Sequence, residues 1–310
     1  MSYEELEQTR INYYKKVKKC ITISLAIIGV MFLSVALPII LSGGSFFSIF
    51  YFGFFAFFGL AIAAVVIVLS TRKDAEAYKK AYKAYFVATT LERTFTNLNY
   101  HHDLGMNREM LADTGMINLG DRYHSNDLVV ANYKNVNFVQ ADAHIEEEHT
   151  DSDGDTTYVT IFKGRFMFFE FPKKFNFRLE VVGSKFRPYK VPRQDQRIIR
   201  KFEKIQTEST DFNKSFRIFA EDGFEAYYIL DPSFMEKIQA IGETYKYQII
   251  FGFTDNKLLV GINDGKDSFE PPKCSKPIDE KVELEKISKD IQVITDFIDK
   301  LNLDKKLFQN

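Results

Sequence analysis

Histidine and carboxylate side chains with metal-binding chemistry alternate along residues 144–148. His144, Glu146 and Glu148 recur at every second position, so on a β-strand they would share one face. Imidazole and carboxylate groups together suit zinc or manganese. The solvated polar face of a sheet has the same composition. The spacing therefore predicts a candidate metal site at these three residues, with an ordinary exposed face as the alternative.

An aspartate-rich stretch, "DSDGD", follows at residues 151–155. An EF-hand loop needs glycine sixth and glutamate twelfth, whereas a loop that begins at Asp151 has Gly154 fourth and Phe162 twelfth. Asp153–Gly154 between alternating strands instead favours a two-residue type I′ hairpin turn. The predicted register places His149 opposite Tyr158, Glu147 opposite Thr160, and Ile145 opposite Phe162. Weak surface binding of calcium or of a basic partner by the three aspartates is the alternative.

Positive charge is concentrated between Lys185 and Lys204. This stretch has eight Lys or Arg residues and only two acidic residues, Asp195 and Glu203. Four of the basic residues fall at helical spacing: Arg193, Arg197, Arg200 and Lys204. The pattern predicts a basic amphipathic helix over residues 194–205 that suits anionic lipid headgroups, at about 1 kcal/mol per well-placed side chain. The alternative is a core helix with a solvated basic side.

No catalytic motif stands out elsewhere in the chain. There is no Gly-x-Ser-x-Gly elbow, phosphate-binding loop, dinucleotide fingerprint or Cys-x-x-Cys pair, so we expect no cofactor and assign no catalytic residue. Asp222 and Glu225 could form a carboxylate pair, but the neighbouring Gly223 favours a structural turn. After Lys73 the chain has more acidic than basic residues, which argues against nucleic acid as a partner.

A run of 52 residues in the N-terminal part of the chain, from Cys20 to Thr71, contains no Asp, Glu, Lys, Arg or His. About 20 apolar residues are needed to cross a bilayer as a helix, and residues 20–41 and 46–69 each reach that length. Gly43–Gly44 between them supplies a tight reversal. We expect a transmembrane helical hairpin over residues 20–69, behind a basic cytosolic segment of residues 1–19.

Lysines and arginines flank both ends of this hairpin, and the connecting loop has none. The positive-inside rule therefore places both termini in the cytoplasm. A reducing compartment agrees with the single cysteine, Cys274, in the region after residue 70.

The remaining chain predicts an α+β architecture. A helical stalk is expected over residues 70–106, with an aromatic stripe at Tyr78, Tyr82, Tyr85 and Phe86. Residues 107–310 then predict a short helix capped by Asn107, an antiparallel meander, a hairpin that turns at Asp255–Asn256, and a C-terminal amphipathic helix. A division of this cytosolic domain into two subunits near residues 185–210 is an alternative to a single body.

The order of these elements resembles a bacterial family of two-span membrane proteins with a domain of unknown function, the DUF3137 type. The resemblance rests on Phe162, Gly164 and Phe166, and on a later set: Asp222, Glu225, Ala226, Tyr228, Leu230 and Pro232. It implies a membrane-anchored cytosolic domain of the bacterial inner membrane and transfers no catalytic residue.

Together these observations predict a membrane-anchored binding or scaffolding module, with a protein partner or self-association besides the bilayer. Two other classes remain open. One is a membrane-bound metal-dependent or hydrolytic enzyme that uses His144, Glu146 and Glu148. The other is a homo-oligomeric pore, which would need an uncharged lining because the hairpin has no ionisable side chain.

Overall fold

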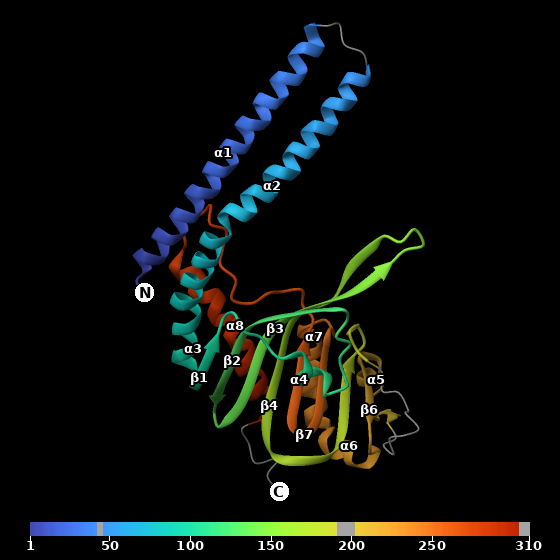
Figure 1. Ribbon diagram of the computed structural model, residues 1–310. Helices are drawn as coiled ribbons and strands as arrows, with labels where there is room; N and C mark the ends of the chain where they lie inside the picture. The colour runs from blue at the N-terminus through green and yellow to red at the C-terminus, as the bar shows by residue number, and fades with distance from the viewer. Residues whose placement is uncertain (42–45, 191–201, 304–310) are drawn as a thin grey trace. The chain divides into compact units, whose positions relative to one another are not determined.

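A computed structural model describes residues 1–41, 46–190 and 202–303, which form two compact units (Figure 1). The first unit comprises Met1–Val87 and Glu270–Glu283, and the second comprises Ala88–Phe269 and Leu284–Asn310. Helices precede an antiparallel sheet, and a further helix follows it. The predicted α+β class is therefore confirmed.

Two long antiparallel helices, α1 (Tyr3–Leu41) and α2 (Phe46–Tyr82), make up most of the first unit. They lie side by side, with Cys20 Sγ 3.4 Å from Ser70 Oγ and Lys16 Nζ 2.5 Å from Asp74 Oδ2. The predicted reversal at Gly43–Gly44 lies outside the described residues. Within the described parts of the chain, no helix is both long enough and apolar enough to cross a membrane.

The aromatic stripe of α2 packs within the first unit, against the segment Glu270–Glu283. Tyr78 and Tyr82 are buried, as is Lys83, whose ammonium lies 3.0 Å from the Glu270 carboxylate. Three tyrosine hydroxyls donate to this segment: Tyr78 to the Pro272 carbonyl at 3.1 Å, Tyr82 to Glu283 at 2.5 Å and Tyr85 to Glu280 at 2.6 Å. These bonds make the stripe a packing surface.

The helical stalk is shorter than its predicted range of 70–106. After α2 the chain forms a π-helix, η1 (Lys83–Ala88), and a short helix, α3 (Thr89–Thr94), and then becomes strand β1 (Thr96–His101). Asn97 and Asn99 are weak helix formers, and pairing of β1 with the next strand satisfies the backbone instead. The prediction of helix through residue 106 was wrong for this reason.

Among its described residues, the second unit has a seven-stranded antiparallel sheet with the order β1-β2-β3-β4-β6-β5, and with β7 also paired to β4. Its remaining strands are β2 (Arg122–Tyr133), β3 (Val136–Thr150), β4 (Thr156–Gly183), β5 (Glu203–Ile205), β6 (Phe216–Ala220) and β7 (Ile249–Ile262). The sheet thus continues through β6 and β7, beyond residues 185–210, and the whole of Ala88–Phe269 belongs to one unit.

The long strand β4 pairs with both halves of β7. Residues 165–170 of β4 pair with residues 262–257, and residues 179–182 pair with residues 253–250 (Figure 1). Within β7, Gly252 lies against Leu259 and Gly261 lies against Ile250, so the strand folds back near Asp255, whose φ is 49°. The hairpin predicted at Asp255–Asn256 is therefore confirmed.

Helices and apolar side chains cover both faces of this sheet. On one face, Phe297 of α8 (Glu280–Leu301) stacks on Phe169. On the other, a buried cluster includes Leu111 of α4 (Arg108–Ala112) and Phe166 of β4. The described part of the unit has three further helices: α5 (Thr210–Ser215), α6 (Gly223–Ile229) and α7 (Pro232–Thr244). The helices predicted after Asn107, after Pro232 and at the C-terminus are confirmed, and the Asn107 side chain accepts from Glu109 N–H as the expected cap.

Candidate functional site

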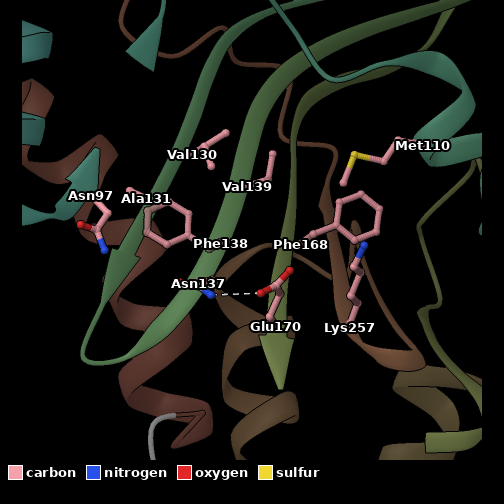
Figure 2. Close-up of a pocket in the computed structure, with 10 residues that line it drawn as sticks. All are labelled: Asn97, Met110, Val130, Ala131, Asn137, Phe138, Val139, Phe168, Glu170 and Lys257. Carbon is pink, nitrogen blue, oxygen red and sulfur yellow. Dashed lines mark hydrogen bonds between the residues drawn. The ribbon is translucent and has the colours of Figure 1, made fainter. Parts of the chain in front are cut away.

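A groove on the sheet of the second unit has a cavity volume of about 270 Å³ (Figure 2). Its apolar lining comes from neighbouring strands and from α4, and includes Val130, Val139, Phe168 and Met110. Val130 is 37% exposed although it is a large apolar residue on a strand. An open, mainly apolar hollow with a few polar groups is the usual form of a binding site.

Polar side chains gather at one end of this groove. Asn137 Nδ2 donates to Glu170 Oε2 at 3.1 Å, which fixes the carboxylate against β3 (Figure 2). Lys257 of β7 is the cross-strand neighbour of Glu170. The groove therefore offers both a negative and a positive group beside an apolar surface, and it can hold an apolar group that carries polar atoms at one end.

The predicted metal residues His144, Glu146 and Glu148 lie on β3, in the part that pairs with β4 towards the tip of the β3–β4 hairpin. His144 Nε2 is 2.8 Å from Thr160 Oγ1 and 3.9 Å from Glu146, and Glu148 accepts from the Tyr158 hydroxyl at 2.8 Å. Each of the three side chains thus has a polar side chain close to it. A metal site at these residues remains a prediction.

The tip of that hairpin differs from the predicted two-residue turn at Asp153–Gly154. The loop has five residues, because Thr150 pairs with Thr156 and Asp151 Oδ1 accepts from the backbone N–H groups of Asp153 and Asp155 at 3.0 and 2.9 Å. Within the loop of residues 151–155, only Gly154 has a positive φ, of 87°. The aspartate side chain closes the loop and removes the need for two left-handed residues.

The predicted register near this tip was consequently wrong by one residue. Thr160 faces Glu146, and Tyr158 faces Glu148. A bulge between Ile145 and Glu146 then restores the predicted pairing of Ile145 with Phe162.

The basic segment falls mainly outside the described residues, which include Lys204 but not Arg193, Arg197 or Arg200. Residues 203–205 form strand β5, where Lys204 is exposed and pairs with Phe219 of β6. The prediction of a helix was therefore wrong for these three residues, because the edge of the sheet provides backbone partners there.

Asp222 has a structural role. Its side chain accepts from the backbone N–H groups of Phe224 and Glu225 at 2.9 and 3.1 Å, and so caps α6. The turn predicted at Asp222–Gly223 is thus the start of a helix, and Glu225 is in its first turn.

Three aspartates that the sequence did not single out come together in the second unit. Asp127 of β2, Asp142 of β3 and Asp267 of the loop after β7 each offer an oxygen within 4.8 Å of the others. Asp127 and Asp142 are almost fully buried. Residues 127, 142 and 267 have no shared spacing, and the one hint is an Asp at position 142 within the apolar run of β3.

Comparison with known proteins finds one family model that matches part of the chain. Residues 160–303, somewhat less than half of the protein, match the model of a family described as a protein of unknown function (DUF3137). This match begins within β4 and covers the C-terminal part of the sheet, α7 and α8. No curated protein matches the chain by sequence.

Among solved structures, the crystal structure of the mycobacterial trehalose monomycolate transport factor A aligns with a TM-score of 0.36 and 7% sequence identity. The alignment covers 72% of this chain and 95% of that one.

Proposed function

We propose that this protein is a membrane-anchored binding module in which the α1–α2 hairpin enters the bilayer and the sheet groove of the second unit receives a partner protein. The observation that carries the proposal is the apolar surface of the hairpin. From Cys20 to Thr71 the chain has no charged residue or histidine.

Exposed apolar side chains along both helices support the anchor. On α1 they include Leu25 and Val30, which are 60% and 67% exposed. On α2 they include Phe57 and Leu69, at 70% and 68%. A large apolar surface of this kind is costly in water and stable in lipid.

The orientation follows from charge. Lys15, Lys16, Lys18 and Lys19 precede the apolar run, and Arg72 and Lys73 follow it. On this proposal the N-terminus, the C-terminus and the second unit are cytoplasmic, and the protein is a two-span protein of the bacterial inner membrane.

Reporter fusions test the anchor and its orientation. A reporter that is active only in the cytoplasm should function at Met1 and after Asn310, and one that is active only outside should function when inserted between Gly43 and Gly44. Release of the unfused protein from membranes by alkaline carbonate would refute insertion, and external activity of the fusion at Asn310 would refute the orientation.

The groove supports a binding role because its volume suits one apolar side chain of a partner protein. Its polar end could contact the polar groups beside that side chain. A partner side chain such as Leu or Phe would bury its apolar atoms against Val139 and Phe168. Glu170 and Lys257 would then pair with backbone or charged groups of the partner.

A matched pair of valine substitutions tests the groove. Val130→Lys places a charge in the groove, whereas Val159→Lys places one on β4 at a valine that is 48% exposed and does not line it. Proteins that co-purify with the full-length chain should be lost with V130K and retained with V159K. Equal recovery with both variants would refute a role for the groove.

The basic segment supports contact with anionic headgroups as part of the same proposal. In lipid nanodiscs, tryptic cleavage at Arg193, Arg197 and Arg200 should be slower with anionic lipid than with zwitterionic lipid. Equal cleavage rates in the two lipids would contradict that contact.

A further inference from the structure

We propose that Asp127, Asp142 and Asp267 form a binding site for one hard divalent cation, Mg²⁺ or Ca²⁺. The three residues belong to different segments of the second unit, and each contributes a carboxylate oxygen to a cluster in which the oxygens lie within 4.8 Å of one another. One ion can contact all three oxygens at that separation, because ligand distances are about 2.0–2.6 Å.

The backbone places these aspartates together by an irregularity in β2. The β2–β3 register shifts between Asn126 and Val129, and Asp127 within this bulge has a φ of 58°. Bulges re-aim side chains and are frequent at functional sites. Asp142 comes from the adjacent strand β3, and Asp267 comes from the loop that follows β7.

An unpartnered buried oxygen within the cluster is the second observation. Asp142 is 2% exposed, and its Oδ2 accepts from the backbone N–H of Ser268. Its Oδ1 is buried and has no hydrogen-bond partner among the described residues. A buried carboxylate oxygen without a partner is unfavourable, and a bound cation would supply the missing interaction.

Polar side chains surround the two buried aspartates. Asp127 is fully buried and accepts from the Tyr100 hydroxyl and from Asn126 Nδ2, each at 2.7 Å. The guanidinium of Arg165 acts on Asp142, but its N–H groups donate to Ser268 Oγ and to the Asp290 carbonyl.

Burial, together with the negative charge of Asp127, raises the pKa of Asp142 to about 7 even with Arg165 close by. Arg165, which acts on Asp142, also lies 3.7 Å from the Asp290 carboxylate. A divalent ion would offset the repulsion that Asp127 and Asp267 exert on Asp142.

The donor atoms select the class of ion. All three ligand side chains are carboxylates, and hard cations prefer such oxygen ligands over the nitrogen and sulfur that favour zinc or copper. Asp267 is exposed, so the site opens to solvent on its side, and water can complete the coordination. The bound ion would tie β2 and β3 to the loop after β7.

Calorimetric titration of the full-length protein in detergent, freed of metals with a chelator, tests the site. At pH 7.5 we expect one equivalent of Ca²⁺ or Mg²⁺ to bind, and Asp267→Asn to weaken binding at least tenfold. Asp267 is exposed, which makes the substitution compatible with folding. Asp153→Asn, at the acidic tip of the β3–β4 hairpin, is the matched control and should leave the affinity unchanged.

Terbium luminescence gives an independent readout. The chain has no tryptophan, and the Tyr100 hydroxyl bonds to Asp127, so tyrosine-excited Tb³⁺ emission should appear, fall when Ca²⁺ is added, and be lost in D267N. Absence of both heat and emission would overturn the proposal and leave a proton shared among the carboxylates. Binding that D153N abolishes and D267N does not would also overturn it.

Discussion

Asp142 should make the protein less stable as pH rises, and Asp142→Asn should remove that dependence. Burial raises the pKa of this carboxyl to about 7 from its ordinary value of 3.8. Since the folded pKa is the higher one, the folded state holds the proton more tightly than the unfolded state. Without a divalent cation, stability is therefore lost as pH increases from about 4 to about 7.

The size of this effect follows from the two pKa values. Each unit of pKa difference corresponds to about 1.4 kcal/mol, so full ionisation of Asp142 costs about 4 kcal/mol. Between pH 5 and pH 8 the cost grows by about 2.5 kcal/mol. Asparagine keeps the acceptor for Ser268 N–H and does not titrate, and any fixed cost of its amide is the same at both pH values.

Urea unfolding of the full-length protein, followed by circular dichroism in a metal chelator, measures the difference. The free energy of unfolding of D142N minus that of wild type should be about 2.5 kcal/mol larger at pH 8 than at pH 5, because the wild type alone loses stability over that range. Adding the divalent cation at pH 8 should stabilise the wild type and not D142N. A difference between the two proteins that does not change with pH would refute the reasoning.

Four further substitutions test the packing of the described residues. Gln140→Met removes a fully buried amide whose oxygen and nitrogen have no partner among the described residues, and should raise the free energy of unfolding by about 1–2 kcal/mol; a loss would contradict this. Gly164→Ala would put a Cβ 2.0 Å from a β7 carbonyl oxygen and should lower stability by more than about 2 kcal/mol, whereas Gly265→Ala, with open space and a φ of 75°, should cost about 1 kcal/mol. Tyr82→Phe removes the buried hydrogen bond to Glu283, so it should lower the free energy of unfolding by about 1–2 kcal/mol and lower the melting temperature with it. An unchanged melting temperature would show that this hydrogen bond contributes nothing to stability.

Features governed by neighbours in the chain could be predicted from sequence. The cap at Asn107, the helix that begins at Pro232 and the hairpin at Asp255–Asn256 depend on local backbone preferences, and the structure has all three. The alternation of apolar residues in β3 and β4 likewise predicted antiparallel pairing. The long charge-free run is a property of composition, and it carries the membrane proposal.

Features that depend on distant pairing could not be predicted in this way. Thr96–His101 became a strand because β2 lies beside it, and residues 203–205 joined the sheet because β6 offers backbone partners. At the β3–β4 tip, one aspartate side chain outweighed the Asp-Gly turn preference and shifted the register.

The acidic cluster shows the same division most clearly. The sequence determined that Asp127, Asp142 and Asp267 are carboxylates, and nothing in their spacing relates them. A bulge in β2, the register of β2 with β3, and the path of the chain after β7 decided that their oxygens meet. Local preferences act over a few residues, whereas a site of this kind exists only when long-range strand pairing brings separate segments of the chain together.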